Sequence, residues 1–270
     1  MKKINCPNCQ SQKYKIVLDV SREADTYLDY LKINYKNVDR FYVKCQKCGL
    51  IYRNPILDEK EKDLLYEHFR DVELRGENKY EYFQKITSLP PEQSENYQKC
   101  VFLEKHISEK GDVLDVGCGA GVFLYAFKNY FSEWKTLGIE PTTEFADVAK
   151  ENGINIIYGY LKEDTLDTKF DLITLIHVLE HMDNFEEMLS MLKNYLKKDG
   201  LLYIEVPSAK DIGYLPGSHD RFMCQHDVIF SKEVLENILT KLGYSIVASE
   251  DFISIRNRNN IRTLSLRQEP

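Results

Sequence analysis

The sequence lacks long apolar runs and an excess of basic residues, and both absences exclude classes of protein. No stretch approaches the roughly 20 apolar residues that a membrane span needs. The segment from Met1 to Cys6 leads into polar sequence without the apolar core of a signal peptide. Lys and Arg total 36 against 43 Asp and Glu, a formal charge of −7, whereas nucleic-acid grooves are basic. We therefore expect a cytoplasmic protein with no membrane span and no nucleic-acid partner.

The length of 270 residues is enough for one α/β core and a smaller appendage. The pattern of elements divides the chain into a zinc-binding subdomain at 1–57, a helical linker or lid at 58–107 and a main α/β domain at 108–270. In the linker, 58–70 has the apolar spacing of an amphipathic helix, and 76–91 is polar and rich in tyrosine.

Cysteine is present in an odd number, seven, and four of the seven form two C-x-x-C pairs. In a reducing compartment such pairs indicate metal ligation before disulfides, and two pairs complete a tetrahedral zinc site. Alternating segments between them, at 14–18 and 40–44, are expected to form hairpin strands. We predict a structural Zn²⁺ held by Cys6, Cys9, Cys45 and Cys48; two unconnected reduced pairs remain possible from the sequence.

A glycine-rich turn stands at the centre of the main domain. The apolar run that contains Asp115 breaks into Gly117, Gly119 and Gly121 and then resumes at helical spacing. Glycines there let the backbone approach a ligand, and the following helix directs its N-terminal amides at the same place. The spacing is G-x-G-x-G, whereas the dinucleotide fingerprint is G-x-G-x-x-G.

Further parallel strands follow, and two of them end in residues suited to adenosine binding. Glu140, followed by Pro141, ends the second strand at the distance from the glycines where a carboxylate binds ribose hydroxyls. Tyr160 and Leu161 follow the third strand and are expected to border the adenine, because ligands lie at the carboxyl ends of parallel strands.

The glycine turn, together with the phrase Leu179-Glu180-His181 after a buried strand at 170–176, resembles motifs I and IV of the class I methyltransferases that use S-adenosylmethionine. The resemblance implies a Rossmann-like sheet of seven strands with helices on both faces. It also implies that Cys118, Ile176 and His177 line the cofactor. The other residues expected to do so are Asp115, Gly117, Gly119, Gly121, Glu140, Pro141, Tyr160 and Leu161. The Asn/Asp-Pro-Pro-aromatic tetrad common in DNA amino-methyltransferases is missing.

A long irregular segment between Pro207 and Ser231 leaves the fifth strand and should hang over the cofactor end of the sheet. Gln225-His226 and the following Phe-Ser fit a phrase found in the resembling sugar and polyketide methyltransferases. An alcohol acceptor must lose a proton, and a histidine is the natural base. We take His226 as the first candidate and His219 and His181 as reserves; each histidine could instead have only a structural hydrogen-bonding role.

The resemblance favours O-methylation of a sugar, either nucleotide-activated or part of a surface polysaccharide. The cysteine knuckles also resemble those of the sugar C-methyltransferases, which have Glu where this chain has Gln225. Two further functions fit the same features: an RNA or protein methyltransferase recruited through the zinc knuckle, and a nucleotide-dependent dehydrogenase. The sequence leaves the oligomeric state open.

Overall fold

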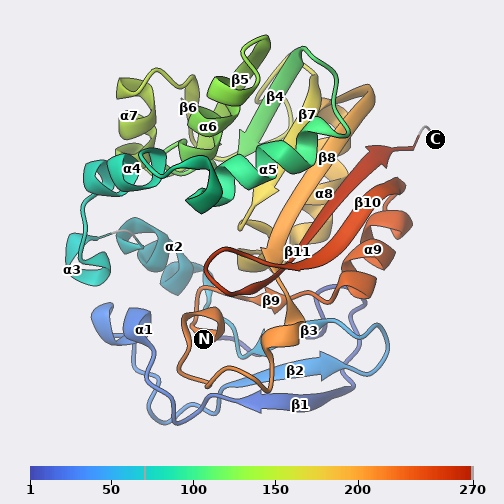
Figure 1. The fold of residues 1–270 in the computed structure, drawn as a ribbon. Coiled ribbons are helices and arrows are strands. Elements are labelled where there is room, and N and C mark those ends of the chain that lie inside the picture. The colour runs from blue at the N-terminus through green and yellow to red at the C-terminus, as the bar shows by residue number, and fades with distance from the viewer. Residues whose placement is uncertain (70, 269–270) are drawn as a thin grey trace.

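The computed structural model describes residues 1–69 and 71–268, which form a large sheet flanked by helices and a small sheet beside it (Figure 1). The large sheet has seven strands in the order β10-β11-β8-β7-β4-β5-β6. Its strands are β4 (Gly111–Val116), β5 (Trp134–Glu140), β6 (Ile156–Tyr158), β7 (Phe170–Ile176), β8 (Leu196–Pro207), β10 (Tyr244–Ile253) and β11 (Asn259–Arg267).

Strands β4 to β8 of this sheet run parallel, and β11 and β10 complete it as an antiparallel pair. Neighbouring residues on the parallel strands contact opposite faces: Val113 and Leu172 belong to one core cluster, whereas Leu114 and Ile173 belong to the other. Because both faces are covered by helices, the central strand β7 is apolar at every position except Asp171 and Thr174. The doubly wound, seven-stranded architecture expected from the resemblance is confirmed.

The helices cover the two faces in separate groups. One face packs against α5 and α6, with α4 and α7 beside them, and the other packs against α8 and α9. The helices are α1 (Thr26–Tyr30), α2 (Glu59–His68), α3 (Val72–Arg75), α4 (Lys79–Thr87), α5 (Glu95–Glu104), α6 (Val122–Tyr130), α7 (Thr143–Glu151), α8 (Phe185–Tyr195) and α9 (Lys232–Lys241). Within the described part of the chain, none is long and apolar enough to cross a membrane.

The small sheet combines the N-terminal segment with a piece of the chain from beyond the fifth parallel strand. Its order is β1-β2-β3-β9, and all its pairs are antiparallel. The strands are β1 (Tyr14–Asp19), β2 (Phe41–Cys45), β3 (Ile51–Asn54) and β9 (Val228–Ile229). Figure 1 shows this sheet beneath the large one, and one core cluster includes residues of both.

Within the linker expected to be helical at 58–107, the tyrosine-rich stretch contains α4, and Phe83 of this helix packs on Tyr125 of α6 with ring centroids 5.4 Å apart. The structure differs from the sequence-based expectation in two segments. The apolar spacing predicts a helix over 185–198 and a strand over 201–207, but α8 ends at Tyr195 and strand β8 already begins at Leu196. Strand β9 was not expected at all, since its two residues pair only with a strand far away in the sequence.

Candidate functional site

The glycine turn connects β4 to α6 in the way that the sequence predicts. Gly117, Gly119 and Gly121 have φ of 73°, 54° and 74°, a region that glycine alone enters freely. A Cβ at Gly117 would lie 2.7 Å from Val178, so glycine is required there for packing. A Cβ at Gly119 would meet nothing within 4 Å, so this residue faces open space. The turn thus forms a cradle into which a ligand can fit against bare backbone.

Glu140 connects the end of β5 to this turn. Its carboxylate accepts hydrogen bonds from the backbone amides of Gly119 at 2.8 Å and Thr142 at 2.9 Å, and the residue is 6% exposed. Each carboxylate oxygen can accept a second bond. Glu140 therefore both braces the turn and keeps acceptors for a pair of hydroxyl groups.

Asp115 lies at the end of β4 under the turn, not at its surface. It is 3% exposed and accepts a 2.6 Å hydrogen bond from the Thr174 hydroxyl. Burial and the charge of Glu140 raise the pKa of Asp115 to about 7, in spite of that hydrogen bond. Its carboxylate is therefore directed at Thr174 of the neighbouring strand β7.

His177 directly follows β7 and has a positive φ of 54°, an unusual conformation for a residue other than glycine. Its ring lies between two buried carboxylates, 3.3 Å from Glu180 and 3.5 Å from Glu205, and the side chain is 40% exposed. Burial lowers the pKa of His177, but the two carboxylates outweigh it and raise the value to about 9. The charged ring therefore links the ends of β7 and β8.

The other residues expected to line the cofactor lie at the carboxyl ends of the strands, with different exposure. Tyr160 is 59% exposed, whereas Leu161 is 5% exposed and belongs to the main core. Cys118 is 7% exposed, and its sulfur packs so closely on Gly138 that a Cβ at Gly138 would collide with it. Ile176 ends β7, and Pro141 follows β5.

The structure brings two of the three candidate histidines together. The ring centroids of His181 and His226 are 4.9 Å apart. One ring nitrogen of each histidine lies within 4.8 Å of a Glu180 carboxylate oxygen. His226 Nδ1 lies 2.8 Å from the Arg221 carbonyl and His181 Nδ1 lies 2.7 Å from the Gln225 carbonyl. A carbonyl only accepts, so both Nδ1 atoms carry the proton. His219 instead caps the short 3-10 helix η4 (Asp220–Phe222) and pairs with Asp220 at 2.8 Å.

The histidine pair has distinct electrostatics. Burial and the neighbouring His181 lower the pKa of His226 to about 4, so this ring is neutral at pH 7 with a lone pair on Nε2. Burial would raise the pKa of Glu180, but the hydrogen bond from His177 and the nearby histidines lower it to about 2. A neutral imidazole thus lies beside a permanent carboxylate.

The four paired cysteines come together as expected. Their sulfurs all lie within 4.8 Å of one another, with Cys6 3.5 Å from Cys48 and Cys9 3.5 Å from Cys45. Zn–S bonds of about 2.3 Å in a tetrahedron require sulfurs about 3.8 Å apart. The Lys47 amide donates to Cys45 Sγ at 3.4 Å. Burial opposes ionisation of Cys45, but such backbone hydrogen bonds lower its pKa to about 7. The donor set and its spacing fit Zn²⁺.

The buried charges near His177 and His226 were not predicted from the sequence. Glu205 interrupts the apolar second half of β8 and pairs with Lys99 at 3.1 Å, and Lys62 bonds Asp227 at 2.6 Å. A lone acid in a buried strand was a usable signal for Glu205. Arg53 and Asp25 lie 3.4 Å apart and are each 1% exposed. Nothing in their sequence surroundings marks these two as buried.

Comparison with known proteins gives a consistent family. A family model described as a methyltransferase domain matches residues 75–249. The C-methyltransferase NovU of Streptomyces niveus is 26% identical over 212 residues, which are 76% of this chain and 46% of that protein. A ubiquinone biosynthesis O-methyltransferase of Glaesserella parasuis is 36% identical over 104 residues, 34% of this chain and 43% of its own length.

The solved structures that are similar share the fold. Magnesium protoporphyrin IX methyltransferase from Synechocystis, solved with S-adenosylhomocysteine, superposes with a TM-score of 0.57 at 15% identity and covers 77% of this chain and 100% of its own. A methyltransferase from Thermotoga maritima gives 0.55 at 17% identity, with 75% and 99% covered. The chain spans less than half the length of the two curated relatives described above.

Proposed function

Because this chain belongs to the class I S-adenosylmethionine-dependent methyltransferases, we propose that it transfers a methyl group to a hydroxyl of a sugar, either nucleotide-linked or a surface-polysaccharide precursor. The observation that carries the acceptor chemistry is the neutral ring of His226 held beside His181 and Glu180.

The cofactor would bind across the ends of β4, β5 and β6. Gly119 would offer bare backbone and open space, Glu140 would accept from the ribose hydroxyls, and Tyr160 would cover the adenine. When bound, S-adenosylmethionine supplies an electrophilic methyl group on a sulfonium. The protein's task is then to hold the acceptor in line and about 3 to 3.5 Å away, in the absence of water.

An alcohol must lose its proton as it attacks, and His226 Nε2 would receive it. Nδ1 keeps its proton and donates it in a hydrogen bond to the Arg221 carbonyl, so the tautomer is fixed for that task. As the ring becomes cationic, the Glu180 carboxylate within 4.8 Å stabilises it. His181 would orient the acceptor, and His219 stays a reserve candidate on the rim.

Exposed tyrosines support a sugar or sugar nucleotide as substrate. Tyr214, in the segment after β8, is 87% exposed, and Tyr160 lies at the end of β6. Such rings stack on the apolar faces of sugars and bases. The charge of −7 and the free cysteines support a cytoplasmic enzyme whose acceptor is not a nucleic acid.

The test combines cofactor binding with product analysis. S-adenosylhomocysteine and NAD are titrated separately by calorimetry, and a panel of nucleotide sugars is incubated with methyl-labelled S-adenosylmethionine and analysed by mass spectrometry. We expect binding of the first ligand alone and a singly methylated sugar. Binding of NAD alone would contradict the cofactor, and a panel without product would contradict the sugar acceptor.

A C-methyl transfer is the second candidate, because the C-methyltransferase from Streptomyces niveus matches 76% of this chain. The carbon shift of the transferred methyl in the product separates an O-methyl from a C-methyl group. Exchange of a sugar C–H for deuterium in D₂O before methylation would also favour carbon as the nucleophile.

A further inference from the structure

Several backbone carbonyls of the segment Asp220–Asp227, which carries His226, accept hydrogen bonds from residues of the small sheet. Tyr42 of β2 donates to the His226 carbonyl at 2.9 Å, and Arg53 of β3 donates to the Phe222 carbonyl at 3.0 Å. The Arg53 amide also donates to the Asp227 carbonyl at 2.8 Å. The small sheet therefore supports this segment through direct hydrogen bonds.

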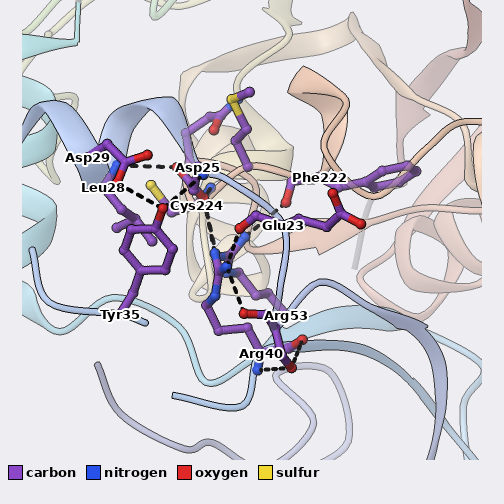
Figure 2. Close-up of polar contacts among 12 residues, drawn as sticks. Glu23, Asp25, Leu28, Asp29, Tyr35, Arg40, Arg53, Phe222 and Cys224 are labelled. Atoms are coloured by element: carbon purple, nitrogen blue, oxygen red, sulfur yellow. Dashed lines mark hydrogen bonds and ion pairs between the residues drawn. The ribbon is translucent and has the colours of Figure 1, made fainter. Parts of the chain in front are cut away.

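Asp25 and Arg53 together hold two consecutive peptide groups. Arg53 bonds the Phe222 carbonyl, while Asp25 Oδ2 accepts from the Cys224 amide at 2.8 Å and lies 3.4 Å from Arg53 Nη2 (Figure 2). The preceding carbonyl, that of Arg221, accepts the Nδ1 proton of His226. The ion pair thus holds the two peptide groups between Phe222 and Cys224, and these directly follow the peptide group whose carbonyl orients the His226 ring.

Arg53 and Asp25 are costly to bury. Two charges removed from water gain little over an apolar pair of similar volume, so stability alone does not account for them. Arg40 provides an internal comparison: it lies 3.7 Å from the same Asp25 and is equally buried, but its guanidinium bonds the carbonyls of Glu23 and Ser21. Of these two arginines, only Arg53 reaches the histidine segment.

We propose that Arg53, with Asp25 as its counter-ion, is a positioning residue that fixes the ring of His226 for proton acceptance. The N-terminal segment 1–57 would then contribute to the active site through the peptide groups that Arg53 and Asp25 hold. The role assigned to His226 rests on the proposed function; the position of the ring does not.

The test compares Arg53→Met with the matched variant Arg40→Met, which removes an equally buried arginine from the same aspartate. In each protein, the titration of His226 is followed by NMR of labelled histidines, with the signal assigned by a His226→Asn variant. The charged or titratable groups around this ring are His181, Glu180, His177 and Asp220. None of them is changed in either variant.

For Arg53→Met we expect the pKa of His226 to rise from about 4 toward its ordinary value of 6.5, because the loosened segment admits water. We expect turnover to fall by about 100-fold, as a displacement of about 1 Å would cause, with S-adenosylhomocysteine affinity within about twofold. Arg40→Met should keep the wild-type titration and turnover. Equal His226 titrations in the wild type and Arg53→Met would overturn the proposal.

Arg53→Lys covers the case in which Arg53→Met does not fold. Lysine keeps the charge opposite Asp25 but lacks the forked donor that reaches two partners. We expect this variant to bind S-adenosylhomocysteine and still lose turnover. Turnover equal to the wild type would show that Arg53 only balances the charge of Asp25, which would contradict the proposal. If no sugar is methylated by the wild type, the NMR titration still decides the positioning role.

Discussion

The phenolic hydroxyl of Tyr42 donates a 2.9 Å hydrogen bond to the carbonyl of His226, 184 residues later in the chain. Tyr42 is fully buried and lies three residues before Cys45, one of the four clustered cysteines. The contact joins the cysteine cluster to the candidate base through a single strand, β2. A substitution of these cysteines should therefore change the position of His226.

Removal of the zinc ion that we predict at the four cysteines should abolish turnover and spare cofactor binding. Without the metal, the ends of β2 and β3 would no longer be held together, and the segment that carries His226 would lose its support from the small sheet. The glycine turn and Glu140 belong to the large sheet, so cofactor binding should not depend on the metal. We expect chelator-treated protein or Cys45→Ser to bind S-adenosylhomocysteine within about threefold of the wild type, which is about half of the ~1.4 kcal/mol that a tenfold change represents. Metal analysis, calorimetry and turnover are the measurements. Cys100→Ala, in α5, serves as the control and should keep its zinc; equal turnover with and without zinc would contradict this expectation.

Glu140→Gln should weaken S-adenosylhomocysteine binding by about 10- to 100-fold, because hydrogen bonds to a charged acceptor contribute about 1.5 to 3 kcal/mol each. Glu144→Gln, an exposed carboxylate on the neighbouring helix α7, is the matched control and should bind like the wild type. Calorimetric titration measures both. An unchanged affinity in Glu140→Gln would remove the ribose role.

Two glycine substitutions should separate folding from cofactor binding. Gly119→Ala places a methyl in open space at positive φ and should cost about 1 kcal/mol of stability while blocking the cofactor. Gly117→Ala carries a similar strain and also collides with Val178 at 2.7 Å, so a further loss of about 1 to 3 kcal/mol is expected. Thermal unfolding with and without S-adenosylhomocysteine gives both quantities. The idea fails if Gly119→Ala is stabilised by the ligand as much as the wild type is.

The turnover rate should fall only at unusually low pH. His226 must be neutral to accept a proton, and its pKa of about 4 places the acid limb well below that of an ordinary histidine at 6.5. We expect a constant rate between pH 6 and 8 and a decline toward pH 4, measured with saturating substrates in the pH range where the protein stays folded. His226→Ala should reduce the rate by about 10²- to 10⁴-fold. An acid limb near pH 6.5 would point to another base.

His177 should make stability depend on alkaline pH. Its folded-state pKa of about 9 lies above the ordinary 6.5, so the stabilisation by its charge is complete below pH 6.5 and is lost as the pH rises through 9. The difference in melting temperature between the wild type and His177→Asn, which tolerates positive φ, should therefore shrink between pH 7 and 10. A difference independent of pH would show that the ring is neutral in the folded protein.

Local patterns in the sequence were enough to predict the large sheet, the glycine turn and the cysteine cluster. Each depends on residues whose spacing has a direct physical meaning: apolar runs for strands covered on both faces, glycines for positive φ at Gly117 and Gly119, and paired thiols for a tetrahedral site. Each strand, turn or C-x-x-C pair is marked by residues that lie close together in the sequence. The meeting of the two cysteine pairs, with Cys9 and Cys45 36 residues apart, was predicted from the need of a zinc site for four thiolates.

The surroundings of His226 were decided only by the tertiary structure. Strand β9 has two residues and no pattern of its own, and it forms because Ile51 and Tyr52 offer it a ladder. The burial of Arg53 and Asp25 depends on their meeting across 28 residues and on a segment from the far end of the chain that covers both. A buried charge is stable only with its partner in place, and which charges become partners is set by the packing of the two sheets.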